Sequence, residues 1–304
     1  MKQTPSDSGL VRQLGLFDSS MIMVGIVIGS GIFLTSGIMA KSIPSAPLLL
    51  LAWLVGGLLT LAGALTYGEL GAAMPEAGGQ YIYLREAYGP LAGFLFGWIL
   101  FLVYMTGGIA GLALAFAEYF GVFFPALSTQ NSILTAQLPF FGRTFSYSLS
   151  AGQLVGVGII VILSMINVFG VRLGKSVQNF FTVLKIATIT AIVIFGLSLG
   201  RGSSINWDIN PENLEWSGLL IGFGVALVAV AWSFDGWNNV NFVAGEIKNP
   251  GKTLPRALIL GTLGVTSLYL LTNLVYLKAV PLPAFIGEVR IAETAVTALF
   301  GVSY

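Results

Sequence analysis

Gly-Ile-Val-Ile-Gly-Ser-Gly-Ile-Phe, residues 25–33, lies in the middle of an uncharged stretch that covers residues 19–40. A stretch of about 20 apolar residues is long enough to span a membrane as a helix. Three glycines at its centre are unexpected, because glycine costs about 1 kcal/mol relative to alanine inside a helix. Glycines four residues apart can serve close helix packing, but the run Gly29-Ser30-Gly31 also allows the backbone to unwind. We therefore expect a helix that is broken within the membrane.

A second interrupted stretch covers residues 216–245, in which residues 232–239 read Trp-Ser-Phe-Asp-Gly-Trp-Asn-Asn. An aspartate at the centre of a membrane helix costs about 2.5–3.5 kcal/mol on insertion scales. A continuous helix exposed to lipid is therefore disfavoured. The alternative is an ordinary turn outside the membrane, with the helix ending at Trp232. Against that alternative, the apolar pattern resumes at Val240.

The composition agrees with a membrane location. Of the 304 residues, 56% are hydrophobic and 9% are charged, whereas about 25% are charged in an average soluble domain. The net charge of +1 disfavours a nucleic-acid partner, which needs a basic surface. The chain has no cysteine and no histidine, which excludes disulfides, haem, and zinc or iron–sulfur sites built on these residues. We expect no cofactor and no metal site.

Charged residues divide the sequence into apolar stretches that can be counted. Full spans are expected at 19–40, 42–68, 87–117, 149–171, 176–200, 216–245 and 257–277. The last stretch, 294–304, is too short to span unless its helix begins earlier, near Pro283. Backbone groups in lipid must be paired within helices. The predicted fold class is therefore all-α, a polytopic helical membrane protein with about seven full spans and part of an eighth.

The distribution of Lys and Arg indicates the orientation, because cytoplasmic loops carry an excess of these residues. With the N-terminus inside, the inner segments hold Lys2, Arg12, Arg85, Arg172, Lys175, Lys248, Lys252 and Arg256. The outer segments hold Lys41, Arg143, Arg201, Lys278 and Arg290. Residues 1–17 are polar and show no cleavable signal pattern. We therefore expect residues 1–17 to form a cytoplasmic N-terminal segment.

The two breaks fall in spans one and six, which are five helices apart. This spacing favours a five-helix repeat used twice within one membrane domain, 1–304, with residues 18–200 as the first repeat and 216–304 as an incomplete second one. Transporters with discontinuous helices bind substrate between the half-helices, where the positive helix end faces an anion and freed carbonyls face a cation. A zwitterionic amino acid fits such a site.

Four stretches of the sequence carry a resemblance to a known family. They are Ile-Gly-Ser-Gly-Ile-Phe at 28–33, Met-Pro-Glu-Ala-Gly-Gly-Gln-Tyr-Ile-Tyr-Leu at 74–84, Gln178-Asn179-Phe180 through Lys185, and Phe234-Asp235-Gly236-Trp237-Asn238 through Glu246 with Asn-Pro at 249–250 and Leu-Pro at 254–255. The chain resembles the amino acid–polyamine–organocation superfamily and, within it, the L-amino acid transporter family. The resemblance implies an inverted-repeat core of ten helices, alternating access, and sodium-independent exchange of amino acids. Because this sequence ends in the eighth helix, we expect a C-terminally truncated member of the family.

The resemblance also implies roles for individual residues. The Ser30 hydroxyl and the Gly31 N–H would hold the substrate carboxylate, and carbonyls of Ile28, Trp232 and Ser233 would take the ammonium group. Trp232 matches the aromatic position that closes the site from outside, and Phe234 and Asp235 would shape the side-chain pocket. The predicted substrate-binding residues are Ile28, Gly29, Ser30, Gly31, Trp232, Ser233, Phe234, Asp235 and Gly236.

Two charges within the spans allow more than one interpretation. With entry near Lys175, ten residues of helix place Lys185 about 15 Å deep. Lys185 would then have one of three roles. It would form a structural pair with no part in transport, take the place of a sodium ion as the resemblance suggests, or carry a coupling proton. Asp235 would either attract cationic amino acids or cap the N–H groups of the second half-helix.

Several functions compete with exchange. A proton-coupled amino acid symporter and a truncated, non-transporting amino acid sensor are the alternatives. An intramembrane enzyme is disfavoured, because an aspartyl type needs two facing carboxylates and a metalloprotease needs histidines. The expected partners are an amino acid substrate and the lipid bilayer, and a homo-oligomer is left open. Related animal transporters pair with a heavy subunit through a disulfide, which a chain without cysteine cannot form, so a bacterial-type plasma membrane is favoured.

Overall fold

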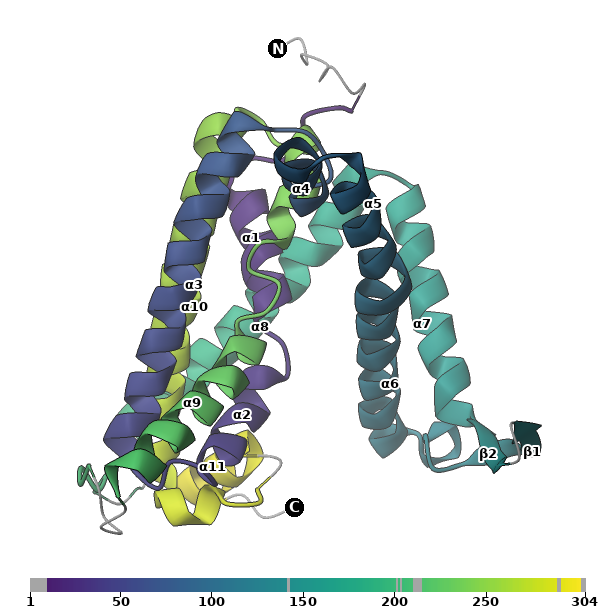
Figure 1. Ribbon diagram of the computed structural model, residues 1–304. Helices are drawn as coiled ribbons and strands as arrows, with labels where there is room; N and C mark the ends of the chain where they lie inside the picture. The colour runs from purple at the N-terminus through teal and green to yellow at the C-terminus, as the bar shows by residue number, and fades with distance from the viewer. Residues whose placement is uncertain are drawn as a thin grey trace. The chain divides into compact units, whose positions relative to one another are not determined.

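The computed structural model describes residues 10–140, 143–200, 202, 204–209, 215–288 and 291–301. These residues form helices and one β-hairpin (Figure 1). The α-helices are α1 (Leu16–Val27), α2 (Gly31–Met39), α3 (Ala46–Ala73), α4 (Gln80–Tyr88), α5 (Pro90–Ile99), α6 (Thr106–Phe123), α7 (Ala151–Val168), α8 (Val171–Ser198), α9 (Trp216–Ser233), α10 (Pro250–Ala279) and α11 (Ile291–Phe300). The other elements are a π-helix, η1 (Leu100–Met105), three 3₁₀ helices, η2 (Pro125–Leu127), η3 (Asn239–Glu246) and η4 (Leu282–Phe285), and the strands β1 (Ser132–Phe140) and β2 (Arg143–Ser150).

The helices confirm a polytopic helical membrane protein. Among the described residues, six helices are long and apolar enough to cross a membrane, and the bent pair α1–α2 brings the number to seven. Helices α5, η1 and α6 form one run of 34 residues, Pro90–Phe123, which overlaps the predicted third span at 87–117 and ends six residues later. Helix α11 has 10 residues, so it is the short eighth segment that the sequence predicts.

The break in the first span lies where the glycines predict it. Helix α1 ends at Val27, and Ile28 has a non-helical conformation with φ −73° and ψ 85°. Helix α2 begins at Gly31 and is bent by 42° from α1. Because Ile28, Gly29 and Ser30 lie between the two helices, backbone carbonyls near the end of α1 lose their usual helical partners.

The sixth span is also interrupted, but its second half differs from the expectation of a resumed helical pattern. Helix α9 ends at Ser233, and the chain turns through Gly236, whose φ of 88° suits glycine. The segment after the turn is the 3₁₀ helix η3 rather than an α-helix. The Asn241 side chain donates to the Asn238 carbonyl at 2.9 Å, and such local side-chain bonds compete with regular α-helix.

The hairpin is an addition to the predicted all-α spans. Strands β1 and β2 pair antiparallel in the segment between α6 and α7. Residues 143–150 read Arg-Thr-Phe-Ser-Tyr-Ser-Leu-Ser, in which polar and apolar residues alternate as in a strand with one face in water. The Ser132 and Ser148 hydroxyls lie 2.6 Å apart across the pair. The alternation is short, and the polar character of the segment alone does not indicate a strand.

The described residues form two compact units. The first comprises the residues up to Ile82 and those from Lys175 onward, and the second is Tyr83–Gly174. The five-helix repeat, with boundaries at 200 and 216, stays a prediction. In the second unit α6 packs on α7, where Gly156 lies against Ala113.

The core of the first unit lies between α3 and α10, which run side by side (Figure 1). The rings of Trp53, Phe234 and Tyr269 contact one another there, with centroids 5.2–6.2 Å apart. A smaller cluster of Val193, Val275 and Leu299 joins α8, α10 and α11. Phe234, which follows the end of α9 at the second break, is therefore packed within this aromatic core.

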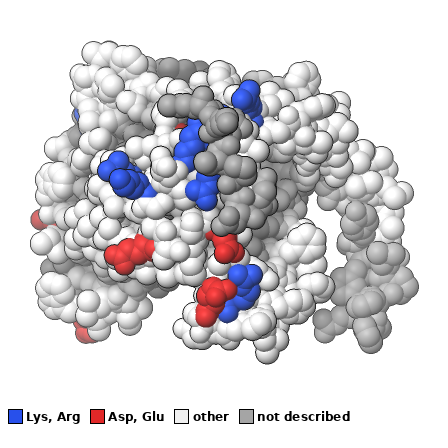
Figure 2. Space-filling model, turned by 90° about the horizontal axis from the view of Figure 1, so that it is seen from above, with Lys and Arg blue, Asp and Glu red and all other residues white. Residues whose placement is uncertain are grey.

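The two ends of the first unit are each tied by contacts between distant segments. At one end Gln13 and Leu14 donate their N–H groups to the Glu246 carbonyl at 2.8 and 2.9 Å. Figure 2 shows the molecule from above, with Lys and Arg and Asp and Glu side chains lying among uncharged residues. At the other end the Ser45 hydroxyl donates to the Asp208 carbonyl at 2.9 Å.

Candidate functional site

The two helix breaks lie against each other. A side chain at Gly31, the first residue of α2, would place its Cβ 2.6 Å from the Ser233 Oγ and 2.8 Å from the Ser233 Cα at the end of α9. The hydroxyls of Thr35 and Ser233 lie 2.6 Å apart and share a hydrogen bond. A Cβ at Gly236 would lie 2.3 Å from the Ile26 side chain of α1. Glycine is therefore required where the two interrupted segments approach.

Lys185 reaches the first break from α8. Its Nζ donates to the carbonyls of Gly25 and Ile28, each at 3.1 Å. In a continuous helix the Gly25 carbonyl would accept from the N–H of Gly29, but that N–H donates to the Val27 carbonyl at 2.8 Å. The ammonium group thus replaces backbone donors that the break removes.

Tyr269 links the two breaks from α10, and it is absent from the residues that the sequence predicts for the site. Its hydroxyl lies 2.9 Å from the Val27 carbonyl and 3.2 Å from the Ser233 carbonyl. A hydroxyl has one proton to donate, so it donates to one of these carbonyls at a time. Tyr269 is fully buried. The signal that could have found it is a polar side chain inside an apolar span, the same signal that distinguishes Lys185.

A buried polar chain continues beside this link. The Ser36 hydroxyl donates to the Asn273 side-chain carbonyl, and the Trp53 Nε1 donates to the Ser36 Oγ at 3.3 Å. These residues belong to α2, α10 and α3. Buried polar groups need partners of this kind, and here they hold α2 in place behind the first break.

The predicted site residues divide into buried and exposed groups. Buried are Ile28, Gly31, Ser233, Phe234 and Gly236, and exposed are Ser30, Trp232 and Asp235, with Gly29 between the two classes. The Trp232 side chain is 73% exposed, whereas Phe234 is 1% exposed within the aromatic core. Of the predicted residues, the structure therefore brings Gly31 and Ser233 together where the two breaks meet. It leaves Ser30, Trp232 and Asp235 exposed and places Phe234 in the aromatic core.

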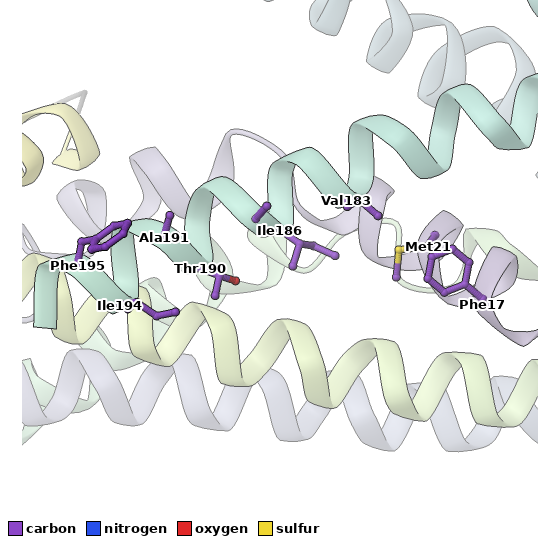
Figure 3. Close-up of a pocket in the computed structure, with 9 residues that line it drawn as sticks. Phe17, Met21, Val183, Ile186, Thr190, Ala191, Ile194 and Phe195 are labelled. Carbon is purple, nitrogen blue, oxygen red and sulfur yellow. The ribbon is translucent and has the colours of Figure 1, made fainter. Parts of the chain in front are cut away.

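A separate groove lies along α8 on the side of α1. It has a volume of about 590 Å³, and its lining is apolar, with Phe17 and Met21 from α1 and residues such as Val183 and Ile194 from α8 (Figure 3). A zwitterion needs hydrogen-bonding partners when it leaves water. The groove does not offer them, so the breaks remain the candidate site.

Outside the spans, burial raises the pKa of Glu246, which ends η3.

No group of three or more acidic, histidine or cysteine side chains that could bind a metal occurs in the part of the chain that the structure describes.

Comparisons with known proteins show the family to which the chain belongs. The family model described as amino acid permease matches residues 14–303. The serine/threonine exchanger SteT of Bacillus subtilis is 34% identical over 300 residues, which are 97% of this chain and 61% of that protein. The human b(0,+)-type amino acid transporter 1 is 32% identical over 294 residues, 96% of this chain and 56% of that protein. The large neutral amino acids transporter small subunit 2 of Mus musculus is 31% identical over 296 residues, 96% and 52% respectively. This chain thus spans about half to three fifths of the length of these relatives. Because the family model matches residues 14–303, the chain belongs to the amino acid permease family.

Proposed function

We propose that the protein is a secondary transporter that exchanges amino acids across a membrane by alternating access and without sodium. The observation that carries the proposal is the meeting of two helix breaks whose freed carbonyls are held by Lys185 and Tyr269. Discontinuous helices of this kind form substrate sites in transporters. The relatives named as an exchanger and as amino acid transporters support the same function.

The proposed substrate site uses the start of α2 for the carboxylate. Helix α2 has no side-chain cap at Ser30, and the first N–H groups of a helix carry partial positive charge. The Ser30 hydroxyl and the Gly31 N–H bind the carboxylate, while the carbonyls of Ile28 and Trp232 accept from the ammonium group. The exposed Trp232 ring covers the bound substrate. Small neutral amino acids fit a site rich in glycine and serine, and the exposed Asp235 either caps η3 or favours cationic side chains.

Lys185 is proposed to serve in place of a coupling sodium ion. Its ammonium group lies between the carbonyls of Gly25 and Ile28, where a bound cation would be stabilised. A fixed cation makes the first break independent of sodium, which leaves exchange of one amino acid for another as the driving process. The alternative is proton-coupled symport, in which this amine carries the proton.

The proposed setting is a plasma membrane of the bacterial type, with the N-terminus in the cytoplasm. The first five-helix repeat covers residues 18–200, and residues 216–304 belong to the second. No disulfide-linked heavy subunit is expected, because the chain has no cysteine.

The test is uptake of a radiolabelled mixture of neutral amino acids into sodium-free proteoliposomes. The protein is used in the length in which its source expresses it, with the 304-residue chain in parallel. Vesicles are either preloaded with unlabelled amino acid or empty. Uptake that requires preloading supports exchange, whereas uptake into empty vesicles that follows a pH gradient would establish symport instead. Amino acid binding without uptake in either form would replace transport by a sensor function.

A further inference from the structure

Helix α8 faces α1 with a line of polar side chains. Lys175 and Asn179 donate to the Asp18 carboxylate, and the Thr182 hydroxyl donates to the Met21 carbonyl at 3.3 Å. Lys185 completes the line at the helix break. Spacings of four, three and three residues keep these side chains on one face of α8. Polar contacts therefore connect the two helices from the N-terminal end of α1 to its break.

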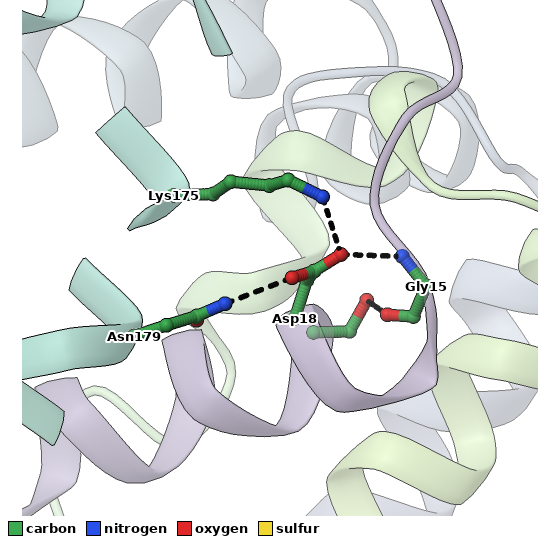
Figure 4. Close-up of polar contacts among 5 residues, drawn as sticks. Gly15, Asp18, Lys175 and Asn179 are labelled. Carbon is green, nitrogen blue, oxygen red and sulfur yellow. Dashed lines mark hydrogen bonds and ion pairs between the residues drawn. The ribbon is translucent and has the colours of Figure 1, made fainter. Parts of the chain in front are cut away.

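The outermost contact of this line is built around Asp18 (Figure 4). One carboxylate oxygen accepts from the Lys175 Nζ at 2.9 Å and from the Gly15 N–H at 3.1 Å, and the other accepts from the Asn179 Nδ2 at 2.8 Å. The Lys175 and Asp18 side chains are 24% and 15% exposed. A largely buried carboxylate that accepts several hydrogen bonds stabilises a contact between helices more than an exposed ion pair does. We call Asp18, Lys175 and Asn179 the clasp.

The Asn179 side-chain amide is oriented by its hydrogen bond to Asp18. Its Oδ1 is buried and has no hydrogen-bond partner among the described residues, so its Nδ2 bond to Asp18 orients the side chain. Leaving a buried amide oxygen unpaired has a cost, which the bond to a charged acceptor offsets. The amide is thus positioned for Asp18.

The helices fit closely behind the clasp. A Cβ at Gly25 would lie 2.2 Å from the Thr182 Oγ1 and 2.3 Å from the Gln178 Nε2. Thr182 is 1% exposed. The helices α1 and α8 are therefore in direct contact at this level, and the clasp joins them again nearer the start of α1.

We propose that the clasp is an inner latch of the transport cycle: Asp18 must release Lys175 and Asn179 before the half-helix α1 parts from α8 and opens the substrate site to the cytoplasm. This inference rests on the proposed exchange function and on the proposed orientation. The clasp forms only while the inner side is closed. Its strength therefore sets the fraction of protein that is open to each side.

The first test compares apparent KM values on the two sides of proteoliposomes that contain protein of one orientation. Asp18→Asn keeps the shape of the side chain and removes its charge. Because an apparent affinity scales with the populated fraction of the competent state, the inner KM should fall and the outer KM should rise. Each change should be roughly threefold to tenfold, the size expected for one charge-assisted pair. The double variant Asp18→Lys with Lys175→Asp should return both values toward those of the unmodified protein.

Glu86→Gln is the matched control. Glu86 also makes an ion pair of 2.9 Å, but its partner Arg85 is its neighbour on α4, so the pair connects no two helices. Its loss should leave both KM values unchanged. If Asp18→Asn shifts both KM values in the same direction or not at all, or if the charge exchange does not rescue them, the latch is wrong.

A second test does not depend on transport. The chain has no cysteine, so Thr182→Cys provides a single thiol that the closed α1 covers. A water-soluble thiol reagent should modify this thiol at least threefold faster when Asp18→Asn is also present, and the charge exchange should slow it again. An unchanged rate would overturn the latch. If the rate responds while the unmodified protein shows no exchange, the latch stands and the proposed function fails.

Discussion

Lys185 and Lys278 each place an ammonium group on two backbone carbonyls, but the carbonyls differ in kind. Lys278 donates to the carbonyls of Gly196 and Leu197 at 3.0 and 2.8 Å, in the last turn of α8, where carbonyls lack helical partners in any case. Lys185 donates to carbonyls of Gly25 and Ile28, which lie in the buried region around the first break. The buried carbonyls of Gly25 and Ile28 therefore depend on their lysine more than the carbonyls at the end of α8 do.

This contrast gives a matched pair of variants at the residue scale. Lys185→Ala should lower the exchange rate roughly tenfold or more, because each buried carbonyl left unpaired costs about 1–3 kcal/mol. Lys278→Ala should leave exchange near that of the unmodified protein, because water can replace its donor at a helix end. The measurement is initial exchange in preloaded proteoliposomes at equal amounts of folded protein. Full exchange in the Lys185 variant would show that its ammonium group is not needed at the break.

At the scale of elements, the position of α9 determines where the second break lies. A Cβ at Gly222 would lie 2.1 Å from the carbonyl oxygen of Ser42, in the connection between α2 and α3. A backbone atom cannot move aside as a flexible side chain can. The start of α9 is therefore held close to the segment that follows α2, and this contact helps keep Ser233 beside Gly31.

We expect Gly222→Ala to destabilise the protein by about 1–3 kcal/mol, the usual cost of overpacking. Gly218→Ala on the same helix is the control, because nothing lies within 4 Å of a Cβ there. Alanine is also the better helix former by about 1 kcal/mol, so the control should be neutral or more stable. The loss of monodisperse protein after heating, followed by size-exclusion chromatography, distinguishes the two. Equal midpoints for both variants would contradict the close approach at Gly222.

The sequence could predict elements whose signal is local. The break before Gly31 and the turn at Gly236 were predictable, because glycines and an aspartate inside an apolar span are costly unless they serve a purpose. The 3₁₀ form of η3 was not, because it depends on which backbone groups the asparagine side chains bond. The role of Tyr269 could not be read from spacing alone, because its partners Val27 and Ser233 are far away in the chain.

At the scale of the whole molecule, one end of the first unit gathers segments that are distant in sequence. The Lys248 N–H donates to the Leu14 carbonyl at 2.8 Å, and Leu14 pairs with Ile247 as an isolated bridge. Lys175 joins this end through Asp18. The opposite end joins Ser45 to Asp208. Within the first unit, one end thus holds Leu14, Lys175 and Lys248, and the other holds Ser45 and Asp208.

A single introduced cysteine can determine which end faces the cytoplasm, because the chain has no thiol of its own. Gly251 lies at the start of α10 and is exposed, and a Cβ there would meet only the Ala72 carbonyl oxygen within 4 Å, at 3.9 Å. Ser204 is exposed beyond the end of α8. With the N-terminus inside, as the excess of Lys and Arg favours, an impermeant maleimide added to intact cells should label Ser204→Cys and not Gly251→Cys. Both should react after permeabilisation, which shows that each thiol is accessible in itself. Labelling of Gly251→Cys alone in intact cells would reverse the orientation, and it would overturn the inner latch proposed around Asp18.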